Sequence, residues 1–164
     1  MAKVILICGK ICSGKTTLAH SLLQESNSVL LSCDELADVL FDKNLGDRHD
    51  EVMARAREYL HRKAADLLAA GCDVILDWGF WKKADRQAAR MRYEALGADQ
   101  LWYYLDPPPA QWQHNIERRN AAVLSGASRD YFVDEGLLKK LLANFEEPAP
   151  EEYDIVYGRS DTGV

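Results

Sequence analysis

The chain has 164 residues, the length of one domain, which is enough to bury about 70% of its unfolded surface without a metal or disulfide. Hydrophobic residues make up 48% and charged residues 28%, so the composition excludes a disordered or fibrous protein. The net charge of −6 disfavours nucleic acid and anionic membranes as partners, because both are negatively charged themselves.

No targeting or membrane-spanning segment is predicted. The first apolar run, residues 4–8, is too short for a secretory signal, and no run reaches the length of a membrane span. The four cysteines have no zinc-binding spacing, so we expect reduced thiols in a cytoplasmic protein.

A phosphate-binding motif follows the first predicted strand. Residues 4–8 predict a buried strand, and residues 9–16 then read G-K-I-C-S-G-K-T, a complete G-x-x-x-x-G-K-[ST] phosphate loop. Its glycines let successive backbone N–H groups point at phosphate oxygens, and the N-terminus of the next predicted helix, which ends near Glu25, extends this anion site. The motif predicts binding of a nucleoside triphosphate.

The chemistry of a triphosphate assigns roles within this loop. We expect Lys15 to reach the β- and γ-phosphates, Thr16 to place its hydroxyl on Mg²⁺, and Thr17 to contact the α-phosphate. Cys8 and Cys12 flank the loop, and we expect both to serve packing and backbone fit. The predicted nucleotide-binding residues are Gly9, Lys10, Ile11, Cys12, Ser13, Gly14, Lys15, Thr16 and Thr17.

A carboxylate follows the second predicted strand, residues 29–32. Ser32 and Glu35 form a capping box for a short helix, and Asp34 lies in its first turn. A hydroxyl acceptor at the γ-phosphate needs a carboxylate to orient it and accept its proton, which makes Asp34 the candidate base. The alternative is favourable electrostatics at a helix N-terminus.

A second carboxylate ends the third predicted strand, residues 73–77, which follows a long helix over residues 51–70 with Tyr59 in its buried stripe. Asp77 has the form of a Walker B residue that binds Mg²⁺, and its alternative role is to cap the next turn. The aromatic residues 78–81 are expected either to form a wall for the acceptor or to close the core.

A predicted helix over residues 82–96 carries basic residues that we expect to form mainly a solvated face: Lys82, Lys83, Arg86 and Arg90. A fourth strand at residues 101–105 and prolines 107–109 precede another helix, which carries Arg118 and Arg119. One of these two arginines is expected to reach the triphosphate from a lid around residues 118–131, because adjacent helical residues point about 100° apart.

Helices and strands alternate along the whole chain, ending in a helix with apolar residues from 137 to 145 and a short strand at 153–157. This order predicts an α/β fold with a parallel sheet and helices on both faces, as one domain over residues 1–164. The phosphate loop, Asp34 and Asp77 then meet at the carboxyl ends of the strands, where such sheets bind ligands.

These motifs, together with the sequence L-D-W-G-F at residues 76–80 and R-R-N at 118–120, resemble a family of small P-loop kinases often described as AAA-type ATP-binding. The group is similar to zeta toxins, chloramphenicol phosphotransferases and the 5′-kinase module of polynucleotide kinases. The resemblance implies a three-layer P-loop NTPase fold like that of nucleoside monophosphate kinases, with strand order 2-3-1-4-5. It also implies that Asp34 is the acceptor base. The chain departs from the larger kinases in ending just after the last predicted strand, so the expected adenine contacts are few: Gly158, Arg159 and a lid arginine.

Three functions are compatible with these features. The first is an ATP- and Mg²⁺-dependent kinase that phosphorylates a hydroxyl of a small molecule, with Lys15, Asp34, Arg118 and Arg119 as candidate catalytic residues. The second is a polynucleotide 5′-hydroxyl kinase, which the acidic charge disfavours. The third is a nucleotide-binding switch or toxin-like regulator. The sequence has no N-K-x-D segment for guanine, which favours ATP.

Overall fold

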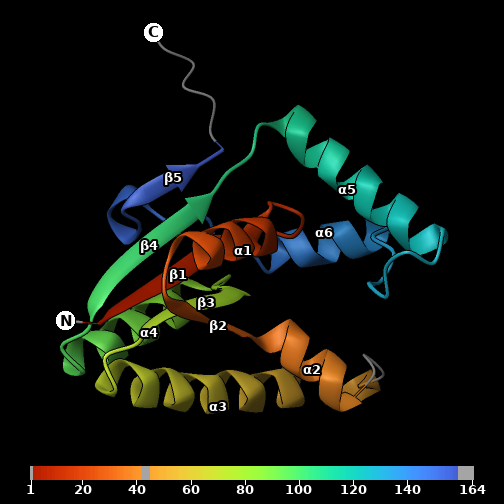
Figure 1. The fold of residues 1–164 in the computed structure, drawn as a ribbon. Coiled ribbons are helices and arrows are strands. Elements are labelled where there is room, and N and C mark those ends of the chain that lie inside the picture. Colours follow the sequence, from red (N-terminus) through yellow and green to blue (C-terminus); the bar gives the residue numbers. More distant parts are fainter. Residues whose placement is uncertain (1, 42–44, 159–164) are drawn as a thin grey trace, which may run out of the picture.

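Strands and helices alternate along the chain in the computed structural model, which describes residues 2–41 and 45–158 (Figure 1). The strands are β1 (Lys3–Gly9), β2 (Ser28–Ser32), β3 (Asp73–Gly79), β4 (Asp99–Leu105) and β5 (Ile155–Tyr157). The helices are α1 (Lys15–Glu25), α2 (Cys33–Phe41), α3 (His49–Ala69), α4 (Lys83–Ala95), α5 (Pro109–Leu124) and α6 (Glu135–Ala143). Two short 3-10 helices, η1 (Gly46–Arg48) and η2 (Pro150–Glu152), precede α3 and β5.

The five strands form one parallel sheet with the order β2-β3-β1-β4-β5, which confirms the predicted fold class and strand order. β1 is central: Val4 pairs with Val74 of β3 on one side and with Gln100 of β4 on the other. Because parallel neighbours need a crossover connection, at least one helix lies between each strand and the next along the chain.

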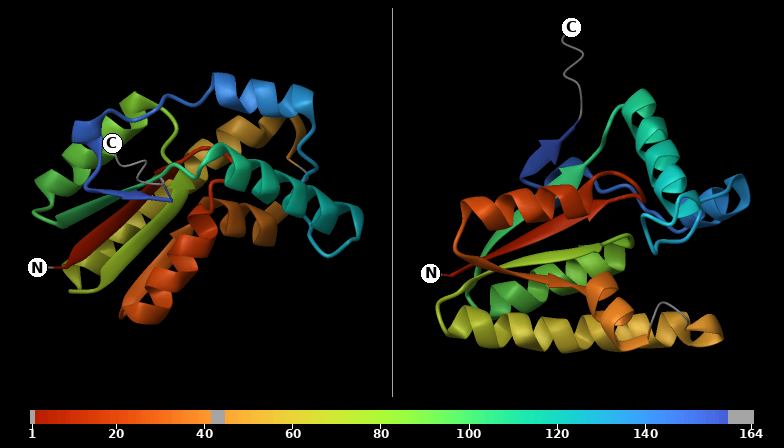
Figure 2. Two further views of the ribbon diagram at one scale, coloured as in Figure 1. Left: turned by 90° about the horizontal axis from the view of Figure 1, so that it is seen from above. Right: turned by 45° about the vertical axis from the view of Figure 1, so that its right-hand side comes forward.

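The apolar side chains of β1 alternate between two cores. Leu6 packs in a cluster with Ala64 of α3 and Ala89 of α4, whereas Ile5 and Ile7 pack with α1 on the opposite face of the sheet. Figure 1 and the right panel of Figure 2 show α1 on one side of the sheet and α3 and α4 on the other. The central strand is therefore buried on both faces, as expected for an unbroken apolar run.

Two groups of elements extend past the carboxyl ends of the strands. α2 and the N-terminal part of α3 lie on one side, and α5, α6 and the connection between them lie on the other (Figures 1 and 2). The loop between β1 and α1 lies at the same edge. Any ligand bound there is approached from both sides.

Two predictions about single side chains were wrong. Tyr59, expected in the buried stripe of α3, is 49% exposed, because it lies at the edge of a groove between α3 and α2. Arg86, expected on a solvated face, is 2% exposed, because its guanidinium donates hydrogen bonds to backbone carbonyls and to the Glu152 carboxylate. Arg159, expected near adenine, lies outside the described residues. Within the described parts of the chain, no helix is both long enough and apolar enough to cross a membrane.

Candidate functional site

The loop between β1 and α1 contains residues in the left-handed backbone conformation, which residues other than glycine rarely adopt. Gly14 has a φ of 97° and Cys12 a φ of 57°, both in the left-handed region. At Gly9, a Cβ atom would lie 2.6 Å from Ser13 Oγ and 3.2 Å from Leu105 Cβ. The tight turn therefore requires glycine at position 9 and favours it at position 14.

Side chains from distant elements hold the carbonyl groups of this loop. Trp81 Nε1 donates to the Gly9 carbonyl at 3.1 Å, and Trp112 Nε1 donates to the Ile11 carbonyl at 2.7 Å. Asn115 Nδ2 donates to the Cys12 carbonyl at 3.0 Å. In a trans peptide unit the N–H points away from its C=O, so these bonds turn backbone N–H groups toward the opposite side of the loop, where an anion can bind.

Lys15 of the loop lies close to two carboxylates, those of Asp77 and Asp34. The Thr16 hydroxyl donates to Asp77 Oδ2 at 2.9 Å, and Lys15 Nζ donates to the Lys10 carbonyl at 2.7 Å. Burial lowers the pKa of Lys15, and the charges of Asp77 and Asp34 oppose that shift. Burial raises the pKa of Asp77, which is 5% exposed, and the Thr16 bond and Lys15 oppose the rise. The ammonium group therefore lies near both carboxylates.

Thr16 and Asp77 also fit a magnesium site. A hydroxyl and a carboxylate oxygen are hard oxygen ligands, which Mg²⁺ prefers, and Mg²⁺ binds through one or two protein oxygens together with substrate phosphates. The 2.9 Å bond holds both oxygens at one place beside the phosphate loop. In P-loop NTPases, Mg²⁺ is held by a hydroxyl of the loop and a Walker B carboxylate, which these two residues match.

Asp34 lies at the same edge, in the first turn of α2. The Glu35 N–H donates to Ser32 Oγ at 3.3 Å, so Ser32 caps the helix as predicted and the Asp34 carboxylate is not needed for that purpose. Among the described residues, no hydrogen bond or ion pair holds this exposed carboxylate. Its charge nevertheless acts on both Lys15 and Asp77, so the three charged groups lie in one area at this edge of the sheet.

α5 presents one face to the phosphate loop. Trp112, Asn115 and Arg119 recur at helical spacing, and each contacts the loop. Burial raises the pKa of Cys12, and the charge and hydrogen bond of Arg119 oppose this rise, so the guanidinium lies beside the loop. Arg118 is exposed on another face of α5. The structure thus brings Arg119, and not Arg118, to the loop.

The segment after α5 folds over Arg119. The guanidinium carbon lies 4.7 Å from the centre of the Tyr131 ring, and Nη2 lies 3.7 Å from Asp130 Oδ1. Asn120 fixes this segment to α5, because its amide both donates to the Val133 carbonyl at 2.9 Å and accepts from the Val133 N–H at 2.8 Å. Arg119 Nε is buried and makes no hydrogen bond, so it keeps a free donor beside the loop.

The aromatic residues 78–81 lie mainly in the core. Phe80 is 2% exposed and packs edge-on against Trp102, with ring centres 5.2 Å apart. Gly79 has a φ of 83°, and a Cβ atom there would lie 2.7 Å from Trp81 Nε1 and 3.3 Å from Lys15 Cε. Of the two predicted roles, closing the core describes Phe80, while Trp81 supports the phosphate loop.

Arg86 fixes the exit of β3 to the C-terminal part of the chain. Its Nε and Nη2 donate to the two carboxylate oxygens of Glu152 at 3.0 and 3.2 Å. Its Nη1 donates to the carbonyls of Phe80, Trp81 and Glu146 at 3.1, 3.3 and 2.9 Å. We call these five bonds the Arg86 clamp. The two N–H groups of Nη1 are shared among three carbonyls, and Nε and Nη2 each pair with one oxygen of the Glu152 carboxylate. The paired carboxylate and these acceptors are why the residue is buried despite its charge.

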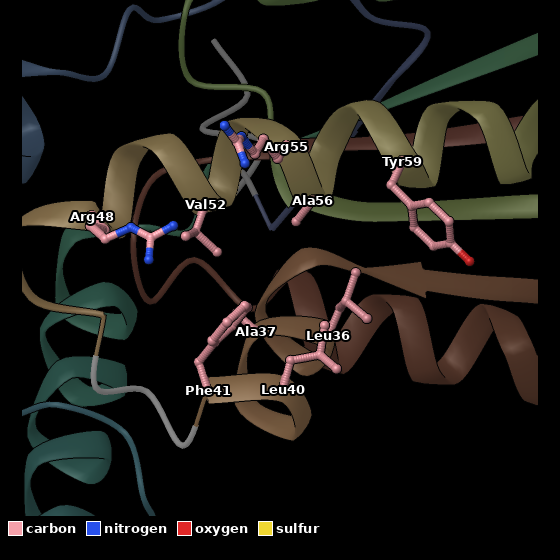
Figure 3. A pocket seen from close by; sticks show the side chains of 9 residues that line it. All are labelled: Leu36, Ala37, Leu40, Phe41, Arg48, Val52, Arg55, Ala56 and Tyr59. Atoms are coloured by element: carbon pink, nitrogen blue, oxygen red, sulfur yellow. The ribbon is translucent and has the colours of Figure 1, made fainter.

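An apolar groove lies away from the phosphate loop, between α2 and α3. Figure 3 shows Leu36, Leu40 and Phe41 of α2 facing α3, with Arg48 and Arg55 at its rim. Its volume is about 460 Å³. Neither Asp34 nor any residue of the phosphate loop lines this groove, so it is not part of the site described above.

Sequence reasoning missed Trp112, Asn115 and the Arg86 clamp. A usable signal was present for the first two, because Trp112, Asn115 and Arg119 follow one helical stripe. Cys8 packs as expected: burial raises its pKa to about 11, so its thiol stays protonated. All four cysteines are free.

The family described as an AAA domain matches residues 4–148, which is most of the chain. No curated protein matches the chain. Solved structures with the same fold include a candidate kinase from Chloroflexus aurantiacus, which is 22% identical with a TM-score of 0.74, over 94% of this chain and 86% of that chain.

Two further structures of this fold are a sugar kinase from Janibacter sp. HTCC2649 and the APS kinase of Mycobacterium tuberculosis in complex with AMPPNP and APS. The first is 21% identical with a TM-score of 0.63, over 95% of this chain and 84% of that chain. The second is 21% identical with a TM-score of 0.63, over 97% of this chain and 90% of that chain. At these identities the likeness shows the fold.

Proposed function

The chain belongs to the AAA domain family of P-loop proteins, and on that premise we propose that it is a kinase that transfers the γ-phosphate of ATP to a hydroxyl of a small molecule. One observation carries this proposal: Lys15 of the phosphate loop lies near both Asp77, which is bonded to Thr16, and the exposed carboxylate of Asp34. A metal-binding carboxylate and a free carboxylate on the two sides of the γ-phosphate position are what phosphoryl transfer to a hydroxyl needs.

In the proposed reaction the acceptor oxygen attacks the γ-phosphorus. The bond from that phosphorus to the β–γ bridging oxygen breaks, and ADP leaves with the electron pair. Asp34 orients the acceptor hydroxyl and takes up its proton. Lys15 neutralises charge on the β- and γ-phosphates, and backbone N–H groups of residues 9–16 bind the remaining phosphate oxygens, with Thr17 at the α-phosphate.

Arg119 is the proposed lid arginine. Its guanidinium lies beside Cys12 of the loop and keeps a buried, unbonded Nε, so it is available for the charge that spreads over the transferred group. Residues 118–131 are the proposed lid of a single kinase domain. Arg118 belongs to the same helix but faces solvent, and we propose no catalytic role for it.

Mg²⁺ is the proposed metal, held by the Thr16 hydroxyl and the Asp77 carboxylate. When bound, it would neutralise charge on the β- and γ-phosphates. The proposed partners are ATP and a small hydroxyl compound in the cytoplasm, and the net charge of −6 supports the view that nucleic acid is not the acceptor.

The test is transfer of labelled γ-phosphate from ATP and Mg²⁺ to a panel of hydroxyl compounds. We expect Lys15→Ala to lower both transfer and ATP hydrolysis by about 100-fold or more. Asp34→Asn should lower transfer by about 100- to 10,000-fold while AMPPNP binding is kept, because only the base is changed. Full transfer by Asp34→Asn would remove the base assignment, and hydrolysis without transfer to any compound would favour a nucleotide-binding switch.

A further inference from the structure

One arginine of α3 differs from the others in having no partner among the residues that the structure describes. Arg55 Nη2 lies 2.7 Å from Glu51 Oε1, and Arg62 Nε lies 3.7 Å from Glu58 Oε1. The side chains of both arginines are well exposed. Arg57 is half-buried, and within the described residues it makes no hydrogen bond or ion pair. Within the described residues, no N–H donor of Arg57 is both buried and unbonded, so its donors reach solvent and are accessible to an anionic ligand.

The packing of α3 places Arg57 close to the start of α2. Met53 and Leu60, four residues before and three residues after it, pack in one cluster with Cys33. Residues at this spacing share a face of the helix, so Arg57 lies at the edge of the face that contacts Cys33. Cys33 directly precedes Asp34, the proposed base.

Electrostatics and a second contact support this position. Burial raises the pKa of Cys33, Arg57 is the charge that opposes this rise, and Asp34 and Asp77 add to it, so these groups surround one thiol. One turn after Arg57, His61 packs edge-on against Trp78 with ring centres 5.0 Å apart, and Trp78 follows Asp77. Arg57 does not line the groove of Figure 3, whose α3 residues are Val52, Arg55, Ala56 and Tyr59.

We propose that Arg57 binds a carboxylate or phosphate group on the acceptor, so that the substrate is a hydroxyl compound that carries negative charge itself. This rests on the proposed function for the identity of the bound molecule as a phosphoryl acceptor. A guanidinium donates two parallel hydrogen bonds that match the paired oxygens of both anionic groups. The chain has a net charge of −6 and two carboxylates, Asp34 and Asp77, at this edge, so an anionic acceptor needs a fixed cation there.

The same arrangement gives selectivity. A neutral acceptor leaves the half-buried Arg57 without a partner, and a site built around a polar group rejects ligands that cannot pair with it. Compounds with one carbon skeleton and different charge therefore test the proposal. Suitable sets are glucose, gluconate and glucose 6-phosphate, and glycerol, glycerate and glycerol 3-phosphate, which also separate carboxylate from phosphate recognition.

The experiment is calorimetric titration of each compound into the full chain with Mg²⁺ and AMPPNP, followed by transfer assays with ATP. We expect at least one anionic compound to bind about 10-fold or more tightly than its neutral counterpart, and Arg57→Gln to weaken that binding about 10- to 100-fold. Arg57→Lys should keep part of the affinity, because it keeps the charge but not the paired donors. Arg62→Gln, on the same helix, is the matched control and should bind as the unchanged protein does.

Each outcome decides a different point. Equal or tighter binding of the neutral compounds, no binding of any anionic compound, or unchanged binding by Arg57→Gln overturns the proposal for Arg57. AMPPNP binding by each variant shows that the chain is folded. If an anionic compound binds through Arg57 but receives no phosphate, the anion site stands and the kinase proposal fails. If transfer occurs only to neutral compounds, the kinase proposal stands and the anion site fails.

Discussion

The two sides of the site are built in opposite ways. On the nucleotide side, three backbone carbonyls of the phosphate loop, at Gly9, Ile11 and Cys12, each accept a hydrogen bond from a side chain. The donors are a tryptophan that follows β3 and two residues of α5. On the acceptor side, formed by α2 and α3, the proposed functional groups Asp34 and Arg57 have no bonded partner among the described residues. One side is held by protein contacts, and the other leaves Asp34 and Arg57 free for a ligand.

This difference matches what each side has to bind. A triphosphate is a fixed structure whose oxygens need donors in defined positions, so organising the loop in advance lowers the cost of binding. The acceptor must also be aligned with the γ-phosphorus, and free side chains on α2 and α3 can pair with it directly. Substitutions on the nucleotide side should therefore disturb several contacts at once, whereas those on the acceptor side should disturb one.

The Arg86 clamp should give the largest change in stability. Arg86→Met leaves the Glu152 carboxylate and the carbonyls of Phe80, Trp81 and Glu146 without their donor, and removing one member of a buried pair costs about 3–5 kcal/mol. We expect a loss of this size in the free energy of unfolding measured with urea.

Two variants make this prediction specific. Arg92→Met removes an exposed pair, in which Arg92 Nη2 lies 2.8 Å from Glu58, and should cost about 1 kcal/mol or less. The double variant Arg86→Met with Glu152→Met should recover part of the loss, because no unpaired charge remains. If Arg86→Met and Arg92→Met cost the same, the clamp does not stabilise the exit of β3 and the nucleotide side is less rigid than described.

The two adjacent arginines of α5 should differ sharply. Arg119→Ala should lower phosphoryl transfer about 100-fold, which is the usual effect of losing one donor to transition-state charge. Arg118→Ala should change it by less than about 2-fold, because Arg118 faces solvent. The measurement is transfer at saturating ATP and acceptor. Equal losses in the two variants would mean that the stripe of Trp112, Asn115 and Arg119 does not define the catalytic face of α5.

The strand order was implied by the family resemblance. Local sequence was enough to predict the phosphate loop and the positions of Asp34 and Asp77 in the chain. Each of these depends on residues adjacent in the chain or on the end of a strand. The supports of the site depend on partners far away: Trp112 bonds to Ile11 across 101 residues, and Arg86 bonds to Glu152 across 66 residues. Composition places Arg86 on a polar face, and only the fold brings Glu152 to it.

Acid should weaken the packing of α3 against α4 and β3 around His61. Burial, followed by the charge of Arg92, lowers the pKa of His61 from 6.5 to about 4, and its Nδ1 lies 2.7 Å from the Tyr93 hydroxyl. Between these two pH values the unfolded chain takes up a proton that the folded chain does not, so the free energy of unfolding falls as the pH falls. Allowing for partial exposure, we expect a loss of about 1–2 kcal/mol.

Urea unfolding at pH 7 and pH 5 measures this effect. His61→Gln should remove a large part of the loss between these two pH values, whereas His114→Gln, at an exposed position of α5, should keep it. Parallel curves for the unchanged protein and His61→Gln would show that another group carries the acid sensitivity. The contact whose loss destabilises the protein in acid would then lie elsewhere than at His61.

The smallest effect tests whether the loop is organised for its ligand or for folding. Trp112→Phe keeps the aromatic ring beside Lys10 but removes the bond to the Ile11 carbonyl. We expect AMPPNP affinity measured by calorimetry to fall about 5-fold, equivalent to about 1 kcal/mol for one hydrogen bond. Gln113→Leu, which removes an exposed bond to Glu117 on the same helix, is the control and should leave affinity unchanged. If Trp112→Phe lowers the free energy of unfolding but not affinity, the carbonyl bonds stabilise the fold alone. An affinity loss with little change in stability means that they turn the backbone N–H groups toward the phosphates.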